Sequence, residues 1–203
     1  MAVPTVQGQD LVVEETDTGL LQWESVDENE KTWFTAEFDL EDFELLSHSG
    51  DKRVGEKLQR ILRTARKMIS RFLITSEGCH VRTALEFSRN WGLGSSSTLV
   101  NNIAKWADRK PVRLLLDSFG GSGYDIACAN SEKPLYYRLE GKQPKAYQVD
   151  FDPPFKKNLF FVYLNVKQSS KASIAQFQEV QDFDDQTLDH ISAISKELVR
   201  CGN

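Results

Sequence analysis

The stretch that decides the fold is Trp91-Gly-Leu-Gly-Ser-Ser-Ser-Thr98, in which two glycines precede three consecutive serines. It follows a strand-like apolar run at residues 81–87 and opens a segment with helical spacing. The apolar positions of that segment are Leu99, Val100, Ile103, Ala104 and Trp106. Glycines let the backbone approach a ligand closely, and the unpaired N–H groups of a helix's first turn attract anions. Serine hydroxyls at such a turn add hydrogen-bond donors and oxygen ligands for a hard cation.

A second glycine-rich turn occurs in Phe119-Gly-Gly-Ser-Gly-Tyr-Asp-Ile-Ala-Cys-Ala129, and it places the carboxylate of Asp125 directly after the glycines. An anion-binding helix start combined with one well-placed acid favours phosphoryl transfer. Each segment also has a purely structural interpretation. Ser95 is a good N-cap for the helix that follows, and Asp125 is an acid in a first helical turn, where the helix dipole stabilises it.

Other phosphate-binding fingerprints are absent from this sequence. It contains no Gly-x-x-x-x-Gly-Lys-Ser/Thr segment and therefore no common P-loop. Gly92 and Gly94 form Gly-x-Gly, but Ser97 stands where the third glycine of a dinucleotide-binding fold belongs. The His-Arg-Asp and Asp-Phe-Gly segments of protein kinases are also missing.

What remains resembles the GHMP kinases, the superfamily of galactokinase, homoserine kinase, mevalonate kinase and phosphomevalonate kinase. Gly92-Leu-Gly-Ser-Ser-Ser97 is similar to their central Gly-Leu-Gly-Ser-Ser phosphate loop. Gly121-Ser-Gly-Tyr-Asp-Ile-Ala127 resembles the signature of the mevalonate-kinase-like subgroup named after its Gly-Tyr-Asp-Ile-Ala segment. The two segments occur in the family's order, with the residue 95–107 helix between them.

The resemblance implies an α+β fold in two parts. Residues 1–152 are expected to form a ribosomal-protein-S5-domain-2-like, ATP-binding domain with a left-handed strand-helix-strand crossover and without its first strands. Residues 153–203, after the boundary at Pro153-Pro154, are expected to begin a ferredoxin-like C-terminal domain.

The resemblance also implies a reaction, in which the γ-phosphoryl group of ATP passes to a small-molecule alcohol or phosphate, with mevalonate-like compounds as candidates. The expected ATP-binding residues are Gly92, Leu93, Gly94, Ser95, Ser96 and Ser97, and the expected substrate-side residues are Gly121, Ser122, Gly123, Tyr124, Lys167 and Ser170. Asp125 would orient and deprotonate the acceptor, and Ser96 would ligate Mg²⁺. Taken alone, residues 167–170 are better explained as a solvated turn with a capping serine.

The sequence departs from the family pattern at three places. Many members carry a magnesium-binding glutamate about three helical turns before the catalytic aspartate, but here that stretch is Leu114-Leu-Leu116. Asp117 is the nearest carboxylate, and only its position makes it a candidate to replace the glutamate. The early Gly-Lys and Gly-Glu-Tyr/His motifs and the late glycine-rich loop are also missing. The chain therefore resembles the middle of a longer kinase. We expect it alone to be inactive and either poorly soluble or homo-oligomeric, with exposed apolar surface near residues 3–13 and 159–166.

An alternative from another class is a non-catalytic nucleotide-binding or interaction protein on a degenerate kinase core, which the missing motifs favour. ATP-dependent diphosphate decarboxylation is less favoured. That branch usually has alanine where this chain has Gly94.

Patterns of apolar and turn residues also predict the order of elements. They predict strands at residues 10–15, 20–25, 31–37, 81–87, 135–139, 146–151 and 158–166, and helices at 55–72, 95–107, 112–117, 171–180 and 184–199. We expect the first two strands to pair with each other across the Asp17-Thr-Gly19 turn.

Composition limits the classes of partner and the compartment. With 25 basic and 30 acidic residues the net charge is −5, which argues against a nucleic-acid partner. No apolar run is long enough to span a membrane, so no membrane partner is expected. Cys79, Cys128 and Cys201 are far apart and lack metal-ligand spacing, which favours free thiols in a reducing cytoplasm.

Overall fold

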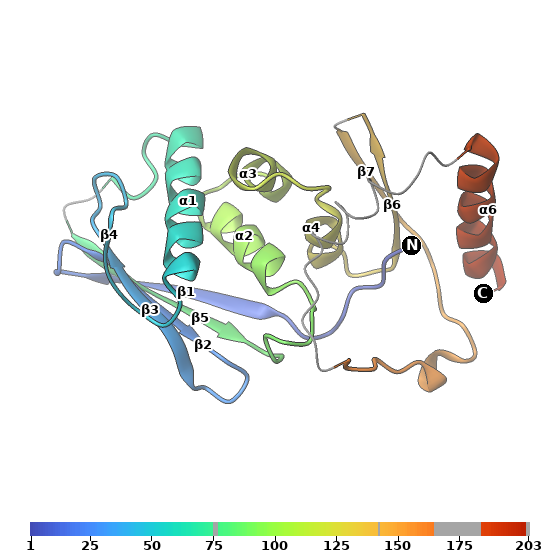
Figure 1. Cartoon of the computed structure of the whole chain (residues 1–203), viewed down its shortest axis with the longest axis horizontal. Helices are drawn as coiled ribbons and strands as arrows, with labels where there is room; N and C mark the ends of the chain where they lie inside the picture. The colour runs from blue at the N-terminus through green and yellow to red at the C-terminus, as the bar shows by residue number, and fades with distance from the viewer. Residues whose placement is uncertain (75–76, 142, 165–183, 202–203) are drawn as a thin grey trace. The chain divides into compact units, whose positions relative to one another are not determined.

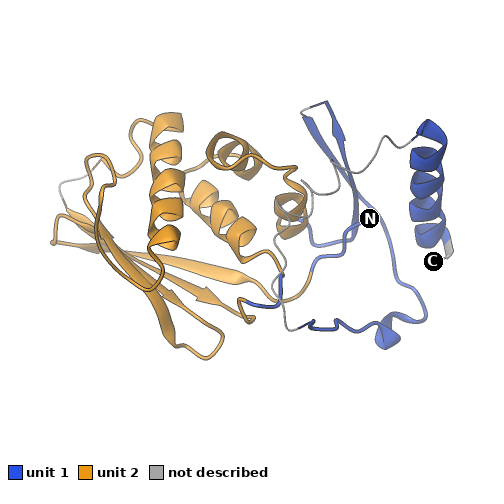
Figure 2. Cartoon of the chain, viewed as in Figure 1, with its two compact units in different colours: residues 1–4, 90–92, 131–203 blue, residues 5–89, 93–130 orange. Residues whose placement is uncertain are grey.

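The computed structural model describes residues 1–74, 77–141, 143–164 and 184–201. It divides by packing into two compact units, coloured separately in Figure 2. Unit 2 comprises residues 5–89 and 93–130, and unit 1 comprises residues 1–4, 90–92 and 131–203. The packing boundary thus falls at residue 131 rather than at Pro153-Pro154, and the division into two kinase-type domains stays a prediction.

Unit 2 is built on a five-stranded sheet in the order β1-β5-β2-β3-β4. The strands are β1 (Gln9–Thr16), β2 (Leu21–Val26), β3 (Thr32–Phe38), β4 (Leu45–Ser49) and β5 (Gly78–Leu85). β5 is antiparallel to β1 and parallel to β2, and the β2-β3 and β3-β4 pairs are antiparallel. β1 is therefore an edge strand, and Val12 on it is about half exposed, in line with the apolar surface expected near residues 3–13.

The predicted pairing of the first two strands is wrong, because β5 lies between them. Gly78 allows β5 to lie between β1 and β2. A Cβ atom at this position would lie 2.6 Å from the Leu20 carbonyl oxygen and 2.5 Å from the Thr18 hydroxyl, so only glycine fits beside the turn. The Cys79 N–H then donates to the same Leu20 carbonyl at 2.9 Å. The 17–19 turn connects two strands that are separated by the width of a third.

Unit 2 has four helices, α1 (Lys52–Met68), α2 (Ser95–Trp106), α3 (Pro111–Ser118) and α4 (Tyr124–Ala129). Of these, α1 and α2 pack against the sheet, whereas α3 and α4 pack against other helices (Figure 1). Asp51 caps α1 by accepting from the Arg53 N–H, and a proline opens α3 at a position where its missing N–H costs nothing. α1 connects β4 to β5, two parallel strands separated by β2 and β3. The left hand expected for this crossover stays a prediction.

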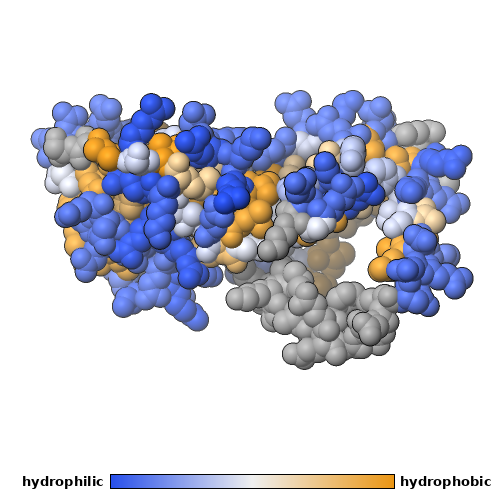
Figure 3. Space-filling model, turned by 90° about the horizontal axis from the view of Figure 1, so that it is seen from above, coloured by the Kyte–Doolittle hydropathy of each residue, from blue (hydrophilic) through white to orange (hydrophobic). Residues whose placement is uncertain are grey.

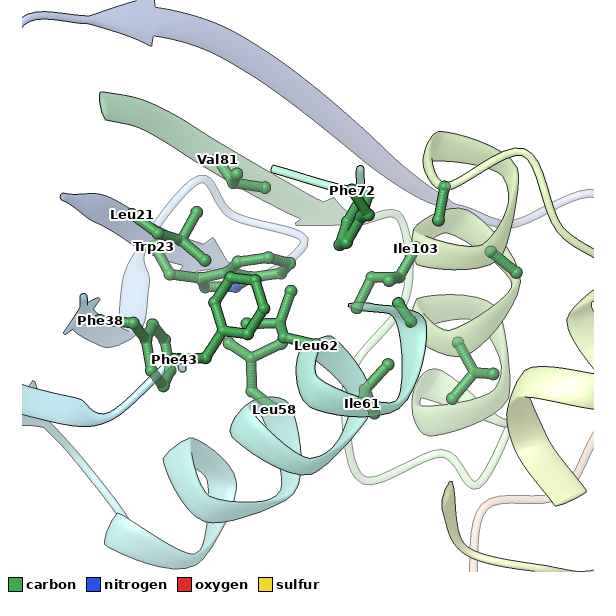
Figure 4. Close-up of a cluster of buried hydrophobic side chains, with 14 of the residues drawn as sticks. Leu21, Trp23, Phe38, Phe43, Leu58, Ile61, Leu62, Phe72, Val81 and Ile103 are labelled. Carbon is green, nitrogen blue, oxygen red and sulfur yellow. The ribbon is translucent and has the colours of Figure 1, made fainter. Parts of the chain in front are cut away.

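The core of unit 2 lies between the sheet and the helices. Figure 4 shows Leu58 and Leu62 of α1 pointing towards aromatic side chains from the sheet side, and Ile61 on the side of α2. Each of these three is at most 2% exposed, and Ile103 of α2 is fully buried. Burial of such side chains contributes about 1.5–3 kcal/mol each, which fixes the helices that carry the glycine segments.

Unit 1 contains the hairpin β6 (Leu135–Glu140) and β7 (Gln143–Gln148), the 3₁₀ turn η1 (Lys156–Asn158) and α6 (Asp185–Cys201). β6 and α6 agree with the sequence-based expectation, whereas β7 begins and ends three residues earlier than the predicted strand at 146–151. The predicted strand at 158–166 is wrong where it is described, because residues 159–164 form no strand, and Phe160 and Phe161 are more than four-fifths exposed. An apolar strand needs a partner to bury it. The predicted turn at 167–170 and helix at 171–180 lie outside the described residues.

On the face shown in Figure 3, hydrophilic residues cover most of unit 2, with smaller hydrophobic areas between them. None of the helices in the described part of the chain combines the length and apolar character that crossing a bilayer requires.

Candidate functional site

The start of α2 is the first component of the site. Gly94 is its N-cap residue and has a left-handed backbone, with φ of +82°, which side chains rarely adopt. Its carbonyl accepts from the N–H groups of Ser97 and Thr98 at 2.8 and 3.0 Å. No side chain caps the helix, and no acceptor for the N–H groups of Ser95 and Ser96 is found among the described residues. These donors are available to an anion.

Asp125 is the second component, and the structure places it against the first. It lies in the first turn of α4, whose N-cap Gly123 also has positive φ. The Ser97 hydroxyl donates to Asp125 Oδ2 at 3.4 Å, across 28 residues of sequence. A Cβ atom on Gly94 would lie 3.8 Å from the Cβ and 3.9 Å from the carboxyl carbon of Asp125. The start of α2 and Asp125 of the second glycine segment therefore converge on one place within unit 2.

α2 is held on two sides by polar side chains one helical turn apart. On the side of β1, Thr98 donates to the Gln9 side chain at 2.7 Å and Asn102 donates to the Gln9 carbonyl at 2.5 Å. On the side of α4, Ser97 reaches Asp125, and Asn101 accepts from the Asn130 side chain. Sequence reasoning missed the asparagines because polar residues on a helix usually face solvent.

The other expected residues of the two loops lie as follows. Gly92 belongs to unit 1 and has positive φ with open space around its Cα, as does Gly121 in unit 2. The Ser122 hydroxyl accepts from the Tyr124 N–H at 3.3 Å, which tightens the second turn. Lys167 and Ser170 lie outside the described residues.

Ser96 and Asp117, the expected magnesium ligands, lie on different helices. The Ser96 side chain is exposed and its hydroxyl has no partner among the described residues. Asp117 accepts from Arg113 at 2.8 Å, one turn away on α3, so an ion pair accounts for it. The serine that contacts Asp125 is Ser97 rather than Ser96. The metal-binding roles of Ser96 and Asp117 stay predictions.

Two titratable groups on α4 report the environment of Asp125. Burial raises the pKa of the Cys128 thiol, and the negative charge of Asp125 raises it further. Burial also raises the pKa of Tyr124, with smaller contributions from Cys128 and Asp125. Both groups are therefore neutral at pH 7.

A cluster that the sequence analysis did not single out is formed by Asp39, Asp42 and Glu44, whose ligand atoms lie within 4.8 Å of one another. Hydrogen bonds within the loop account for it. Asp39 accepts from the N–H groups of Glu41, Asp42 and Glu44, and Arg63 donates to Asp42. Burial tends to raise the pKa of Asp39, but these N–H donors outweigh it and hold the pKa below its ordinary value. The cluster is a turn built around one carboxylate.

Replacing Asp39 with Asn is expected to lower the free energy of unfolding at neutral pH. This loss of stability is expected to become smaller as the pH falls. The lowered pKa means that the ionised carboxylate stabilises the fold above the ordinary value of 3.8, and this contribution is lost as the pH falls through the folded-state pKa. Urea unfolding of both proteins between pH 7 and pH 2.5 measures it. A difference in unfolding free energy that does not change with pH would contradict the assignment.

The converging residues offer N–H donors, hydroxyls and one carboxylate at a single helix start. Such groups are suited to phosphate oxygens and to a hard cation such as Mg²⁺. Searches with protein-family models, against curated proteins and against solved structures found no match to this chain.

Proposed function

We propose that this chain carries the phosphate-binding and catalytic residues of an ATP-dependent small-molecule kinase of the GHMP type. The observation that supports the proposal best is the contact between Ser97 and Asp125 beside the left-handed Gly94. It joins an anion-binding helix start to an acid within one compact unit, as phosphoryl transfer requires. The S5-like fold, the cytoplasmic location and a homo-oligomeric state belong to the same proposal.

The roles follow from the chemistry of each group. The free N–H groups of Ser95 and Ser96, with the α2 dipole behind them, would hold phosphate oxygens of ATP. Hydroxyl and carboxylate oxygens at this point fit Mg²⁺, which prefers hard oxygen ligands and would neutralise charge on the transferring group. Asp125 would orient the acceptor hydroxyl and accept its proton. The acceptor is proposed to be a small alcohol or phosphate, with mevalonate-like compounds first among the candidates.

The proposal is tested by titrating the protein with ATP in the presence and absence of Mg²⁺, using calorimetry and thermal unfolding. Binding to the folded state stabilises it by about 2.7 kcal/mol when the ligand concentration is 100 times Kd. No binding and no stabilisation at millimolar Mg²⁺ and ATP would refute the proposal. Binding by the full-length protein with no transfer to any of a panel of small alcohols and phosphates would favour the non-catalytic nucleotide-binding alternative.

Replacing Ser96 with Ala is expected to raise the Mg²⁺ concentration needed for half-maximal ATP binding several-fold, because an oxygen ligand is lost from a cation that demands near-octahedral coordination. Ser97→Ala is the matched comparison, since it removes the neighbouring hydroxyl that contacts Asp125. ATP titrations at graded Mg²⁺ concentrations measure both variants. A larger change in Mg²⁺ dependence for Ser97→Ala would transfer the ligand role to Ser97.

A further inference from the structure

α4 is a short helix whose direction must come from its surroundings. It has six residues, and isolated helices of this length are not stable in water. Ile126, at 1% exposure, anchors one side of it in the core of unit 2. One buried side chain fixes where a helix lies, but the helix can still rotate about that point of contact.

A pair of asparagines holds the other end of α4. The Asn130 side-chain N–H₂, at the C-cap, donates to the Ile126 carbonyl at 2.9 Å and to the Asn101 side-chain oxygen at 2.5 Å. Asn101 belongs to α2 and is only 4% exposed. Asn130 itself is exposed, so the cost of breaking the contact falls on Asn101. A buried polar group left without its partner costs about 1–3 kcal/mol, so this contact favours a single arrangement of the two helices.

The two contacts from α2 reach opposite ends of α4. Ser97 and Asn101 are one helical turn apart and lie on the same side of α2. Ser97 contacts Asp125 in the first turn of α4, and Asn101 contacts Asn130 directly after its last turn. Together with Ile126 they remove the rotation that would carry the Asp125 carboxylate away from Gly94.

We propose that Asn101 is a positioning residue for Asp125, acting through Asn130 to hold α4 so that the carboxylate lies at the start of α2. The catalytic consequence rests on the proposed kinase function, whereas the placement of the carboxylate does not. The chain offers a matched control in Asn102, the adjacent residue on the same helix, whose amide donates instead to the Gln9 carbonyl.

The placement is tested by NMR, through the backbone amide resonances of residues 95–97. Asp125→Asn removes the charge beside these amides and defines the resonance shifts that report the carboxylate. Asn130→Ala, at an exposed position at the opposite end of α4 from Asp125, is expected to shift the same resonances in the same direction. In the Asp125→Asn background it should produce little further change, because non-additivity is the signature of action through a shared group.

Three results would overturn the inference: unchanged 95–97 resonances in Asn130→Ala, additive shifts in the double variant, or an equal effect from Asn102→Leu. Asn101→Leu, which removes the acceptor from the other side, must reproduce the effect of Asn130→Ala. Far-UV circular dichroism and the unfolding midpoint of each variant show whether it is folded.

The catalytic consequence is tested with the full-length protein and the same variants. Asn130→Ala and Asn101→Leu are expected to lower kcat about tenfold or more, because a misplaced acid loses orientation, while Kd for ATP stays within about twofold. Equal losses in kcat and ATP affinity would contradict a positioning role. If the parent protein binds no ATP, the kinase proposal fails, but the resonance shifts still decide whether the asparagines place Asp125.

Discussion

Replacing Asp125 with Asn lowers the rate of phosphoryl transfer by about 10²–10⁴-fold, because the amide cannot accept the proton of the acceptor hydroxyl. The side chain keeps its shape, and the Ser97 hydroxyl still has an oxygen to donate to, so the site is expected to stay assembled. ATP affinity should change much less than the rate. ADP release from the full-length protein, measured with mevalonate and a panel of small alcohols, gives the rate, and calorimetry gives the affinity.

The control for this experiment is Asp117→Asn. Asp117 lies on α3 in an ion pair with Arg113, and exposed pairs of this kind contribute about 0–1 kcal/mol. At saturating Mg²⁺, Asp117→Asn should therefore leave the rate nearly unchanged, whether or not Asp117 ligates the cation. If the two substitutions reduce the rate equally, or if Asp117→Asn alone abolishes it, the assignment of the catalytic acid to Asp125 is wrong.

Replacing Gly94 with Val weakens ATP binding by at least about tenfold and also destabilises the start of α2. The left-handed backbone at φ of +82° costs a residue with a side chain about 1–2 kcal/mol, and a β-branched side chain fits it worst. The added side chain would also stand beside Asp125, in the space where a phosphate must approach the N–H groups of Ser95 and Ser96. ATP titration and urea unfolding separate the two effects.

Gly141→Val is the matched control, because Gly141 also has positive φ, at +61°, and a Cβ atom there meets nothing within 4 Å. Gly141 lies in unit 1, at the β6-β7 turn, and is not part of the proposed phosphate site. A valine there introduces the backbone strain of a side chain at positive φ and nothing else. We expect it to lower stability by a similar amount and to leave ATP affinity unchanged. An ATP affinity of Gly94→Val equal to that of the parent would remove this loop from the phosphate site.

Local elements with strong residue patterns could be predicted from the sequence, whereas long-range pairing could not. α2 was predicted within one residue because glycine and serine mark its start and apolar residues recur at helical spacing. β4 was missed, because its residues, Leu45–Ser49, are mostly polar and exposed. Nothing in the sequence near the 17–19 turn shows that a strand from residue 78 onwards lies between β1 and β2.

The candidate site shows the same division. The glycines and Asp125 stand out because their types are unusual at those positions, and the structure brings Gly94 and Asp125 together. Asn101 and Asn130 do not stand out, since an asparagine on a helix or at its end is ordinary, and its importance depends on a partner 29 residues away. Asp39 likewise acquires its role from the N–H groups of its own loop, whose conformation the sequence does not display.

The position of β5 has a consequence for how the chain folds during synthesis. β5 pairs with both β1 and β2, yet it leaves the ribosome more than fifty residues after β2 has been made. Until residue 85 has emerged, β1 and β2 have no common partner, and the apolar faces of β2 and β3 have only α1 to cover them. Folding rates fall as contacting residues lie further apart in sequence, and exposed strand edges promote association. Nascent chains from which residue 85 has not yet emerged should therefore require chaperone protection that longer ones do not.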